Sequence, residues 1–122
     1  MAKTILVVED DPDTLRLVAY SLEQQGYQVL TARDGQAAVD AFNWTQPDLV
    51  LLDMMLPKKS GHDVLGWIKG NRTTANVPVV GLSALVAEAD VKLAADRGID
   101  AYLRKPFRIE ELLQTVERFL GE

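Results

Sequence analysis

The sequence predicts an α/β fold in which five parallel strands form a doubly wound sheet covered by five helices. Short apolar runs alternate with helix-like segments, and no long linker, repeat or low-complexity tract lies between them. Five such pairs in 122 residues cannot close an eight-stranded barrel, so an open sheet with helices on both faces remains. Right-handed crossovers restrict its strand order, and the order 2-1-3-4-5 places the first and third strands side by side.

The strands are predicted from their apolar character. The middle strands are continuously apolar, which is typical of strands that helices cover on both faces. Pro78 can begin a strand, because the first residue of a strand need not donate a hydrogen bond to the sheet. The predicted strands are, in chain order, Thr4–Val8, Gln28–Thr31, Leu49–Leu52, Pro78–Leu82 and Ala101–Leu103.

The first three helices are predicted from their capping residues and apolar stripes. Asp11 followed by Pro12 is typical of an N-cap and first helical position, and Gly26 is typical of the residue that ends a helix. Asp34 is expected to cap the second helix and Ser60 the third. The expected buried faces are Leu15, Val18, Ala19 and Leu22 in the first helix, Ala37, Ala38, Ala41 and Phe42 in the second, and Val64, Leu65 and Ile68 in the third.

The last two helices differ in the strength of their pattern. The fourth, expected over Leu85–Arg97 and closed by Gly98, is rich in alanine and has a narrow apolar stripe. The fifth helix has the clearest buried face, formed by Ile109, Leu112, Leu113, Val116 and Leu120.

The tryptophans and the histidine are expected to have structural or surface positions. We expect Trp44 and Trp67 to lie at or within helices and to cover the core. His62, the only histidine, is expected to be exposed and not to be a ligand.

The composition excludes several classes of function. The chain has 18 acidic residues against 13 Lys plus Arg, and its basic residues are scattered, so direct binding to nucleic acid is not expected. No apolar stretch approaches the roughly 20 residues of a membrane span, and no secretory leader precedes the first strand. The absence of cysteine excludes disulfides and thiol chemistry. A single domain over residues 1–122 in a cytoplasmic setting is expected.

Polar side chains follow four of the predicted strands at one edge of the sheet. The acids Glu9-Asp10-Asp11 follow the first strand and Asp53 follows the third. Ser83 follows the fourth strand, and Lys105 comes shortly after the fifth. Because the carboxyl ends of parallel strands lie together, these groups should converge where doubly wound folds bind their ligands.

Carboxylates gathered in this way require a counter-charge. Two carboxylates about 5 Å apart repel each other by roughly 3 kcal/mol at an effective dielectric of about 20. A raised pKa, a nearby lysine or a bound cation would relieve this repulsion. A few hard oxygen ligands suit Mg²⁺ (or Mn²⁺) shared with phosphate, and Asp53 beside a metal and Lys105 could accept a phosphoryl group. The residues therefore support a Mg²⁺-dependent aspartyl-phosphate site.

Four motifs in this order resemble those of bacterial response-regulator receiver domains of the chemotaxis-regulator-like type. The resemblance covers essentially the whole chain, and the four motifs together are far more specific than any one alone. It implies the flavodoxin-like form of the predicted fold. The motifs are Val7-Val8-Glu9-Asp10-Asp11-Pro12, Leu52-Asp53-Met54-Met55-Leu56-Pro57 with Gly61, Leu82-Ser83-Ala84, and Lys105-Pro106-Phe107.

The resemblance implies a role for each acidic position. Asp53 corresponds to the phosphoacceptor. Asp10 and Asp53 correspond to direct metal ligands, Glu9 to a ligand acting through water, and the backbone carbonyl of Met55 completes the metal site. Glu9 stands where the family more often has Asp, which lengthens the arm by one methylene and retains the carboxylate.

Further positions correspond to groups that stabilise or report the phosphoryl group. Ser83 matches the switch hydroxyl, where threonine is more usual, and Ala84 the small residue whose N–H reaches the phosphoryl group. Lys105 matches the family's lysine. Tyr102 matches an aromatic switch position, although ordinary packing at a sheet edge would explain it equally well. The structural positions are Pro57, Gly61 and Pro106, the last of which commonly follows a cis peptide bond.

As a receiver, the protein would be a two-component phosphorelay component and not an enzyme beyond its own phosphorylation and dephosphorylation. It would take its phosphoryl group from a sensor histidine kinase or phosphotransfer protein. A shift in the fourth helix, fifth strand and fifth helix would then alter binding to a downstream protein target. The resemblance allows a monomer or a phosphorylation-dependent dimer, and either a stand-alone receiver or a domain of a larger protein.

Three other functions are alternatives to this prediction. A degenerate receiver could serve as a phosphorylation-independent interaction module, although every required group is present. A phosphohydrolase of the haloacid-dehalogenase type would need a second Asp where this chain has Met55. An FMN carrier would need a phosphate-binding loop after the first strand, where Glu9-Asp10-Asp11 would repel phosphate.

Overall fold

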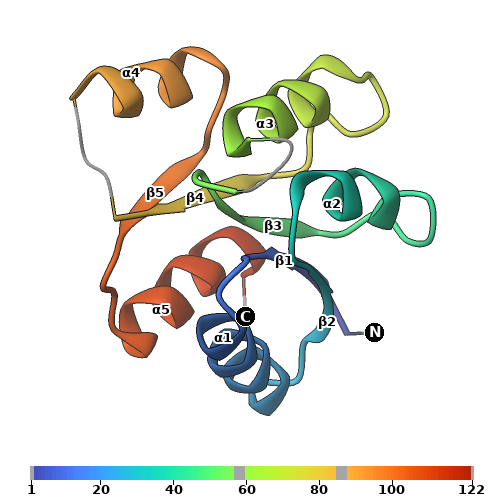
Figure 1. The fold of residues 1–122 in the computed structure, drawn as a ribbon. Helices are drawn as coiled ribbons and strands as arrows, with labels where there is room; N and C mark the ends of the chain where they lie inside the picture. The colour runs from blue at the N-terminus through green and yellow to red at the C-terminus, as the bar shows by residue number, and fades with distance from the viewer. Residues whose placement is uncertain (1, 57–59, 85–87, 122) are drawn as a thin grey trace.

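A single parallel sheet lies at the centre of the computed structural model, which describes residues 2–56, 60–84 and 88–121 (Figure 1). The strand order is β2-β1-β3-β4-β5, and every neighbouring pair is parallel, so the predicted fold is confirmed. The strands are β1 (Thr4–Val8), β2 (Gln28–Ala32), β3 (Leu49–Asp53), β4 (Val79–Ser83) and β5 (Ala101–Arg104).

The predicted strand ends differ from the structure by one residue in four strands. β2, β3, β4 and β5 each end one residue later than expected, and β4 begins after Pro78. Asp53 and Ser83 are therefore the last residues of their strands. Their backbone groups belong to the sheet, because Asp53 is paired with Leu82 across β3 and β4, and Ser83 with Arg104 across β4 and β5. This pairing fixes both side chains more firmly than a loop would.

Five helices connect and cover the strands. Asp11, Asp34 and Ser60 cap α1, α2 and α3 as predicted, each accepting a hydrogen bond from the backbone N–H three residues later. The fourth helix ends at Asp96, one residue before the expected Arg97, and Leu85, where it was expected to begin, lies outside the described residues. The helices are α1 (Pro12–Gln24), α2 (Gly35–Ala41), α3 (Gly61–Gly70), α4 (Glu88–Asp96) and α5 (Ile109–Leu120).

The core has two layers, one on each face of the sheet. Alternate residues of β1 enter opposite layers, with Ile5 and Val7 facing α1 and α5, and Leu6 and Val8 facing the other helices. Figure 1 shows α1 and α5 on one side of the sheet and α2, α3 and α4 on the other. The carboxyl ends of the strands, where doubly wound folds bind their ligands, lie between these two helical layers.

The two tryptophans do not behave alike. Trp67 packs edge to face against Phe42, with ring centroids 5.3 Å apart, and contributes to the core as predicted. The prediction for Trp44 is wrong, because this side chain is 84% exposed. α2 ends at Ala41, and the Trp44 N–H donates to the Ala41 carbonyl in the turn that follows. Trp44 has therefore left the helical face that would have directed it inward.

Lys69 joins four segments at the amino end of β4. Its ammonium donates to the carbonyls of Ala75 and Val77, at 3.2 and 2.9 Å, and to Asp100 Oδ2 at 3.0 Å. Asp100 Oδ2 also accepts from the Val79 N–H at 2.8 Å. The side chain of Lys69 is only 17% exposed, so these acceptors replace most of its water.

Replacing Lys69 by methionine should lower the free energy of unfolding by about 2 kcal/mol, because partly buried acceptors would lose a charged donor. The same change at the exposed Lys92 of α4 should alter stability by less than about 0.5 kcal/mol. Urea denaturation followed by circular dichroism measures both. Equal effects of the two variants would contradict the role assigned to Lys69.

Among the helices of residues 2–56, 60–84 and 88–121, none combines the length and the apolar character needed to cross a membrane.

Candidate functional site

Three carboxylates meet at the carboxyl edge of the sheet. β1 and β3 are neighbours in a register that pairs Val8 with Leu52, so the residues that come next in each strand lie together. One carboxylate oxygen from each of Glu9, Asp10 and Asp53 lies within 4.8 Å of the others. Glu9 is 1% exposed and Asp53 is 3% exposed. The predicted convergence of these acids is therefore present.

Lys105 reaches the same point from the segment after β5. Its ammonium donates to Glu9 Oε1 and to Asp53 Oδ2, the latter at 3.3 Å. The Lys105 N–H donates to the Ser83 carbonyl at 2.8 Å, and the peptide bond between Lys105 and Pro106 is cis, as the resemblance implied. The lysine is thus anchored to the end of β4 while its side chain crosses to the acids.

The crowding of these charges changes their ionisation. Burial is the largest cause of the raised pKa of Glu9, which lies at about 7, and a hydrogen bond with Asp53 also favours the protonated acid. The hydrogen bond from Lys105 opposes this rise. Burial of the Lys105 ammonium lowers its pKa, but the hydrogen bond to Glu9 and the charge of Asp53 outweigh burial and raise it. Lys105 therefore stays charged, while Glu9 changes its protonation state near neutral pH.

The donor set suits a hard divalent cation. All the candidate ligand atoms are carboxylate oxygens, which Mg²⁺ and Mn²⁺ accept and which softer metals do not select. A cation there would also offset the mutual repulsion that contributes to the raised pKa of Glu9. Glu9, Asp10 and Asp53 are the residues that would hold it.

The raised pKa of Glu9 predicts that Mg²⁺ binding depends on pH. Binding requires the carboxylate form, which below pH 7 is the minor form. Mg²⁺ affinity should therefore fall about tenfold between pH 8 and pH 6, and each ion bound at pH 6 should release about one proton. Isothermal titration calorimetry in buffers of different ionisation enthalpy measures both quantities.

Glu9→Gln is the matched control for this pH dependence. The variant should bind Mg²⁺ more weakly, and its affinity should vary much less between pH 6 and pH 8. An unchanged tenfold dependence in Glu9→Gln would assign the titration to another group.

The backbone around Asp53 is held from two sides. The Met55 N–H donates to Asp53 Oδ1 at 2.9 Å, and the Met54 N–H donates to the Leu82 carbonyl at 2.9 Å. The first turn of α3 presses on the same segment at Gly61, where an added Cβ would lie 2.4 Å from Met54 Cα and 2.6 Å from the Asp53 carbonyl oxygen. A glycine is thus required here for close approach, which gives a physical reason for the structural role implied for Gly61.

The structure places the other predicted residues around this centre. Ser83 is buried at the end of β4, and Ala84 is exposed at the rim. Tyr102 is half-buried on β5 directly opposite Gly81, where an added Cβ would lie 2.6 Å from Ile99 Cδ1 and 3.1 Å from the Tyr102 ring. The side chain of Met55 is 55% exposed. The predicted structural residue Pro57 lies outside the described residues.

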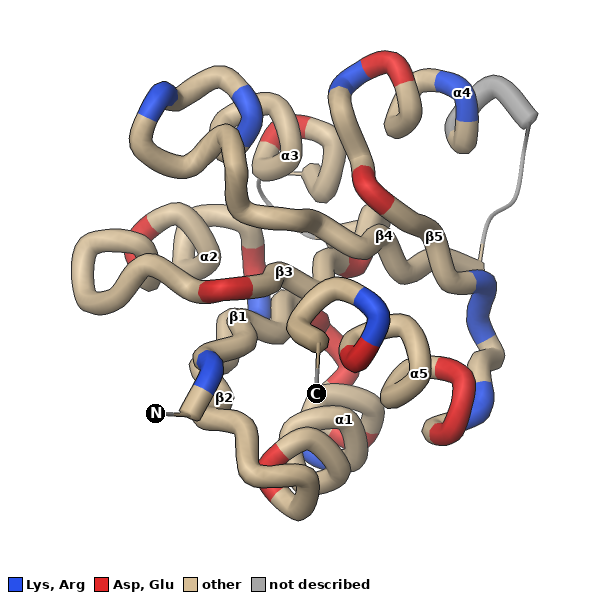
Figure 2. Tube along the Cα trace, turned by 180° about the vertical axis from the view of Figure 1, so that it is seen from behind, with Lys and Arg blue, Asp and Glu red and all other residues tan. Residues whose placement is uncertain are grey.

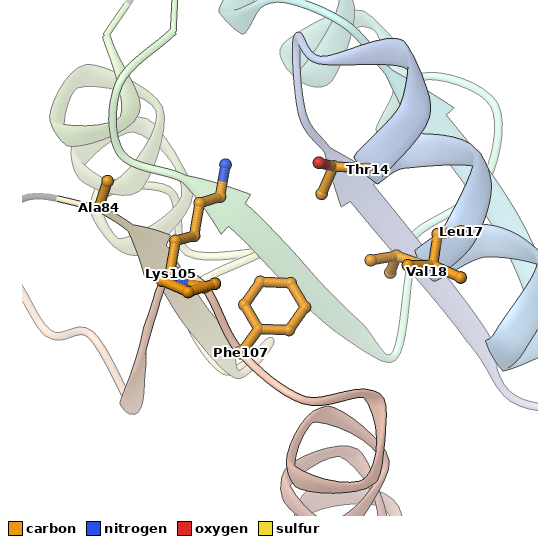
Figure 3. Close-up of a pocket in the computed structure, with 7 residues that line it drawn as sticks. Thr14, Leu17, Val18, Ala84, Lys105 and Phe107 are labelled. Carbon is orange, nitrogen blue, oxygen red and sulfur yellow. The ribbon is translucent and has the colours of Figure 1, made fainter.

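A groove beside the site was not predicted from the sequence. It measures about 330 Å³ and runs between α1 and the segment after β5. Figure 3 shows Lys105 and Ala84 on one side of the groove and residues of α1 on the other, with the Phe107 ring between them. The sequence feature that could have indicated this groove is Leu17, an apolar residue that lies off the buried stripe of α1. It is 54% exposed in the structure. The lining residues are Thr14, Leu17, Val18, Ala84, Lys105, Pro106 and Phe107.

His62 also differs from its prediction. It is only half-exposed, and its Nδ1 is buried without a hydrogen-bond partner among the described residues. Its carbonyl accepts from Arg97 Nη1 at 3.2 Å, which links the first turn of α3 to the segment after α4.

A doubly wound sheet of this order, with clustered acids and a lysine at its carboxyl edge, is the arrangement that the resemblance to two-component receiver domains implied. The family profile described as response regulator receiver domain matches residues 5–117, and this chain belongs to that family.

Named relatives and solved structures agree with this assignment. The polar-differentiation response regulator DivK of Brucella ovis is 30% identical over 122 residues, covering 100% of this chain and 99% of that protein. The receiver domain of a sensor histidine kinase of Pseudomonas aeruginosa PAO1, solved with magnesium in its active-site cleft, is 30% identical. Its TM-score is 0.90, with 100% of each chain covered.

A second solved structure is the signal receiver domain of a histidine kinase from Syntrophus aciditrophicus. It is 33% identical, with a TM-score of 0.91, and covers 98% of this chain and 91% of that one. Similar receivers thus occur both as response regulators and as domains of kinases.

Proposed function

We propose that this receiver accepts a phosphoryl group on Asp53 in a Mg²⁺-dependent step. The observation that carries the proposal is the meeting of Asp53 with Glu9, Asp10 and the Lys105 ammonium at one point of the sheet edge. The magnesium in the cleft of the Pseudomonas receiver supports the choice of cation. The donor would be a phosphohistidine of a sensor kinase or phosphotransfer protein.

In this reaction a carboxylate oxygen of Asp53 attacks the phosphorus atom, and the bond between phosphorus and the histidine nitrogen breaks. The carboxylate of Asp53 is the nucleophile, and the Lys105 ammonium lies 3.3 Å from its Oδ2. The Met55 N–H holds Asp53 Oδ1 at 2.9 Å and so orients the carboxylate. A bound Mg²⁺ supplies positive charge that neutralises the phosphoryl oxygens.

Lys105, Ser83 and Ala84 would bind the phosphoryl oxygens. The hydrogen bond from the Lys105 N–H to the Ser83 carbonyl fixes the position from which Lys105 extends. Ser83 ends β4 one residue after the Leu82 that pairs with Asp53, and its hydroxyl and the N–H of Ala84 would donate to the phosphoryl group. The Met55 carbonyl would complete the metal site, and Glu9 would act on the metal through water.

Phosphorylation adds roughly 1.5 to 2 negative charges at this edge. Contacts from Ser83 and Lys105 to these charges would favour a shifted form of α4, β5 and α5, to which a downstream protein binds. Of the α4 side chains that are described, only Ala94 is buried, while Val91 is 36% and Leu93 is 39% exposed. Because α4 buries so little of its described surface, it is the element most readily displaced. Tyr102, on the neighbouring strand β5, would move with it.

The test is the intact mass of the protein after incubation with acetyl phosphate, once with Mg²⁺ and once with a chelator. We expect a gain of one phosphoryl group only when Mg²⁺ is present. No gain in folded protein that binds Mg²⁺ would favour the second candidate, a receiver that acts as a phosphorylation-independent interaction module.

A further inference from the structure

Trp44 occupies an unusual position for a large aromatic side chain. It is 84% exposed, which is the highest exposure among the large apolar residues of the described chain. Its backbone is nevertheless fixed, because the Trp44 N–H donates to the Ala41 carbonyl at 3.1 Å, and the Thr45 N–H reaches the same carbonyl at 3.4 Å. The exposed indole is thus carried by an ordered turn. Tryptophan is enriched among the residues that dominate binding energy in protein interfaces.

The indole forms one wall of a groove of about 300 Å³. The groove lies between β2 and α2, away from the acids and from Lys105. Its floor is apolar, and its one charged group is the carboxylate of Asp40, whose Oδ1 accepts from Gln36 Nε2 at 3.0 Å. The lining residues are Leu30, Thr31, Ala37, Asp40, Ala41 and Trp44.

The charged residue of the groove lining is acidic. Between Arg33 and Lys58 the sequence contains no lysine or arginine, and α2 and the loop before β3 carry Asp40 and Asp48. Figure 2 shows the loop between α2 and β3 without blue, and with red in α2 and just before β3. Arg33 follows the lining residue Thr31 by two positions and is not itself a lining residue. A cationic group placed in the groove would meet the Asp40 carboxylate and an aromatic face.

The adjoining strand offers a further feature for binding a polypeptide. β2 pairs only with β1, so its outer edge carries backbone groups that no other strand of the described sheet uses. The side chains of Gln28 and Thr31 on this strand are exposed. An extended segment of a partner could therefore hydrogen-bond along β2 while one of its side chains enters the groove.

We propose that the groove between β2 and α2 binds an arginine side chain on an extended segment of a partner protein. The planar guanidinium stacks on the Trp44 indole and pairs with the Asp40 carboxylate, and its methylene stem covers Leu30 and Ala41. Arginine fits better than lysine, because only the guanidinium can stack flat on an indole and also present paired donors to a carboxylate. This groove is separate from the phosphoacceptor edge, so it gives the receiver a second surface for contact with a partner protein.

The test uses two peptides that differ only in charge, acetyl-Gly-Arg-Gly-amide and its citrulline counterpart. Each is titrated into the ¹⁵N-labelled protein at low salt, and the two indole N–H signals are followed by NMR. Trp44→Ala identifies the Trp44 signal. We expect the arginine peptide to shift this signal and the amides of Ala37 and Ala41, and Asp40→Asn to weaken binding about fivefold or more.

Variants on α1 serve as matched controls. Tyr20→Ala removes another exposed aromatic residue and Glu23→Gln another exposed acid, and both should bind the arginine peptide like the native protein. Equal shifts with the citrulline peptide, no shift of the Trp44 signal, or unchanged affinity in Asp40→Asn would each overturn the proposal. Self-association that Trp44→Ala abolishes would assign the groove to a second copy of this chain instead.

Discussion

Replacing Asp53 by alanine is expected to abolish the gain of a phosphoryl group from acetyl phosphate. Asp53 is 3% exposed, and its carboxylate accepts from the Met55 N–H and the Lys105 ammonium, contacts that an alanine removes. Asp10 and Glu9 are close, but their place in the cluster suits them to hold the cation. We therefore expect the loss to be complete within the sensitivity of intact-mass measurement.

The control for this experiment is Asp96→Asn, which changes an exposed acid at the end of α4. It should gain one phosphoryl group at the native rate in the presence of Mg²⁺. Circular dichroism should show that Asp53→Ala is folded, and the Lys105 ion pair with Glu9 should persist in it. A phosphoryl group on folded Asp53→Ala would show that the acceptor has been misassigned.

Replacing Gly61 by alanine is expected to destabilise the protein by about 3 kcal/mol, at the upper end of the range for overpacking. The added Cβ would lie 2.4 Å from Met54 Cα and 2.9 Å from the Met54 carbonyl carbon. These are backbone atoms held by the sheet, since the Met54 N–H is bonded to the Leu82 carbonyl, so they cannot move aside as a flexible side chain could. The first turn of α3 or the end of β3 must shift instead.

Gly66, one turn farther along α3, provides the matched control. It is exposed, and a Cβ there would meet nothing within 4 Å. Gly66→Ala should therefore raise the free energy of unfolding by about 0.5 to 1 kcal/mol, because alanine favours the helix. Urea denaturation of both variants measures the difference. A loss below about 1 kcal/mol in Gly61→Ala would mean that the contact with β3 is not tight.

Local pattern was sufficient for the elements of the fold. The apolar runs and the caps at Asp11, Asp34 and Ser60 predict the strands and helices, because each depends on near neighbours in the chain. Right-handed crossovers only restrict the strand order, and the resemblance to receiver domains implied the order that the structure has. Once the first and third strands are adjacent, the positions of Glu9 and Asp53 at the strand ends bring them together. The carboxylate cluster therefore follows from strand order and the sequence alone.

Tertiary structure decided the properties that depend on what surrounds a residue. The pKa of Glu9 near 7 arises from burial and from the proximity of Asp53. Both depend on how the chain packs in three dimensions and not on the local sequence. The need for glycine at position 61 appears only when α3 is packed on β3, and the exposure of Trp44 only when α2 is seen to end at Ala41. Sequence determined which groups are present, and packing decided their ionisation, spacing and contact with water.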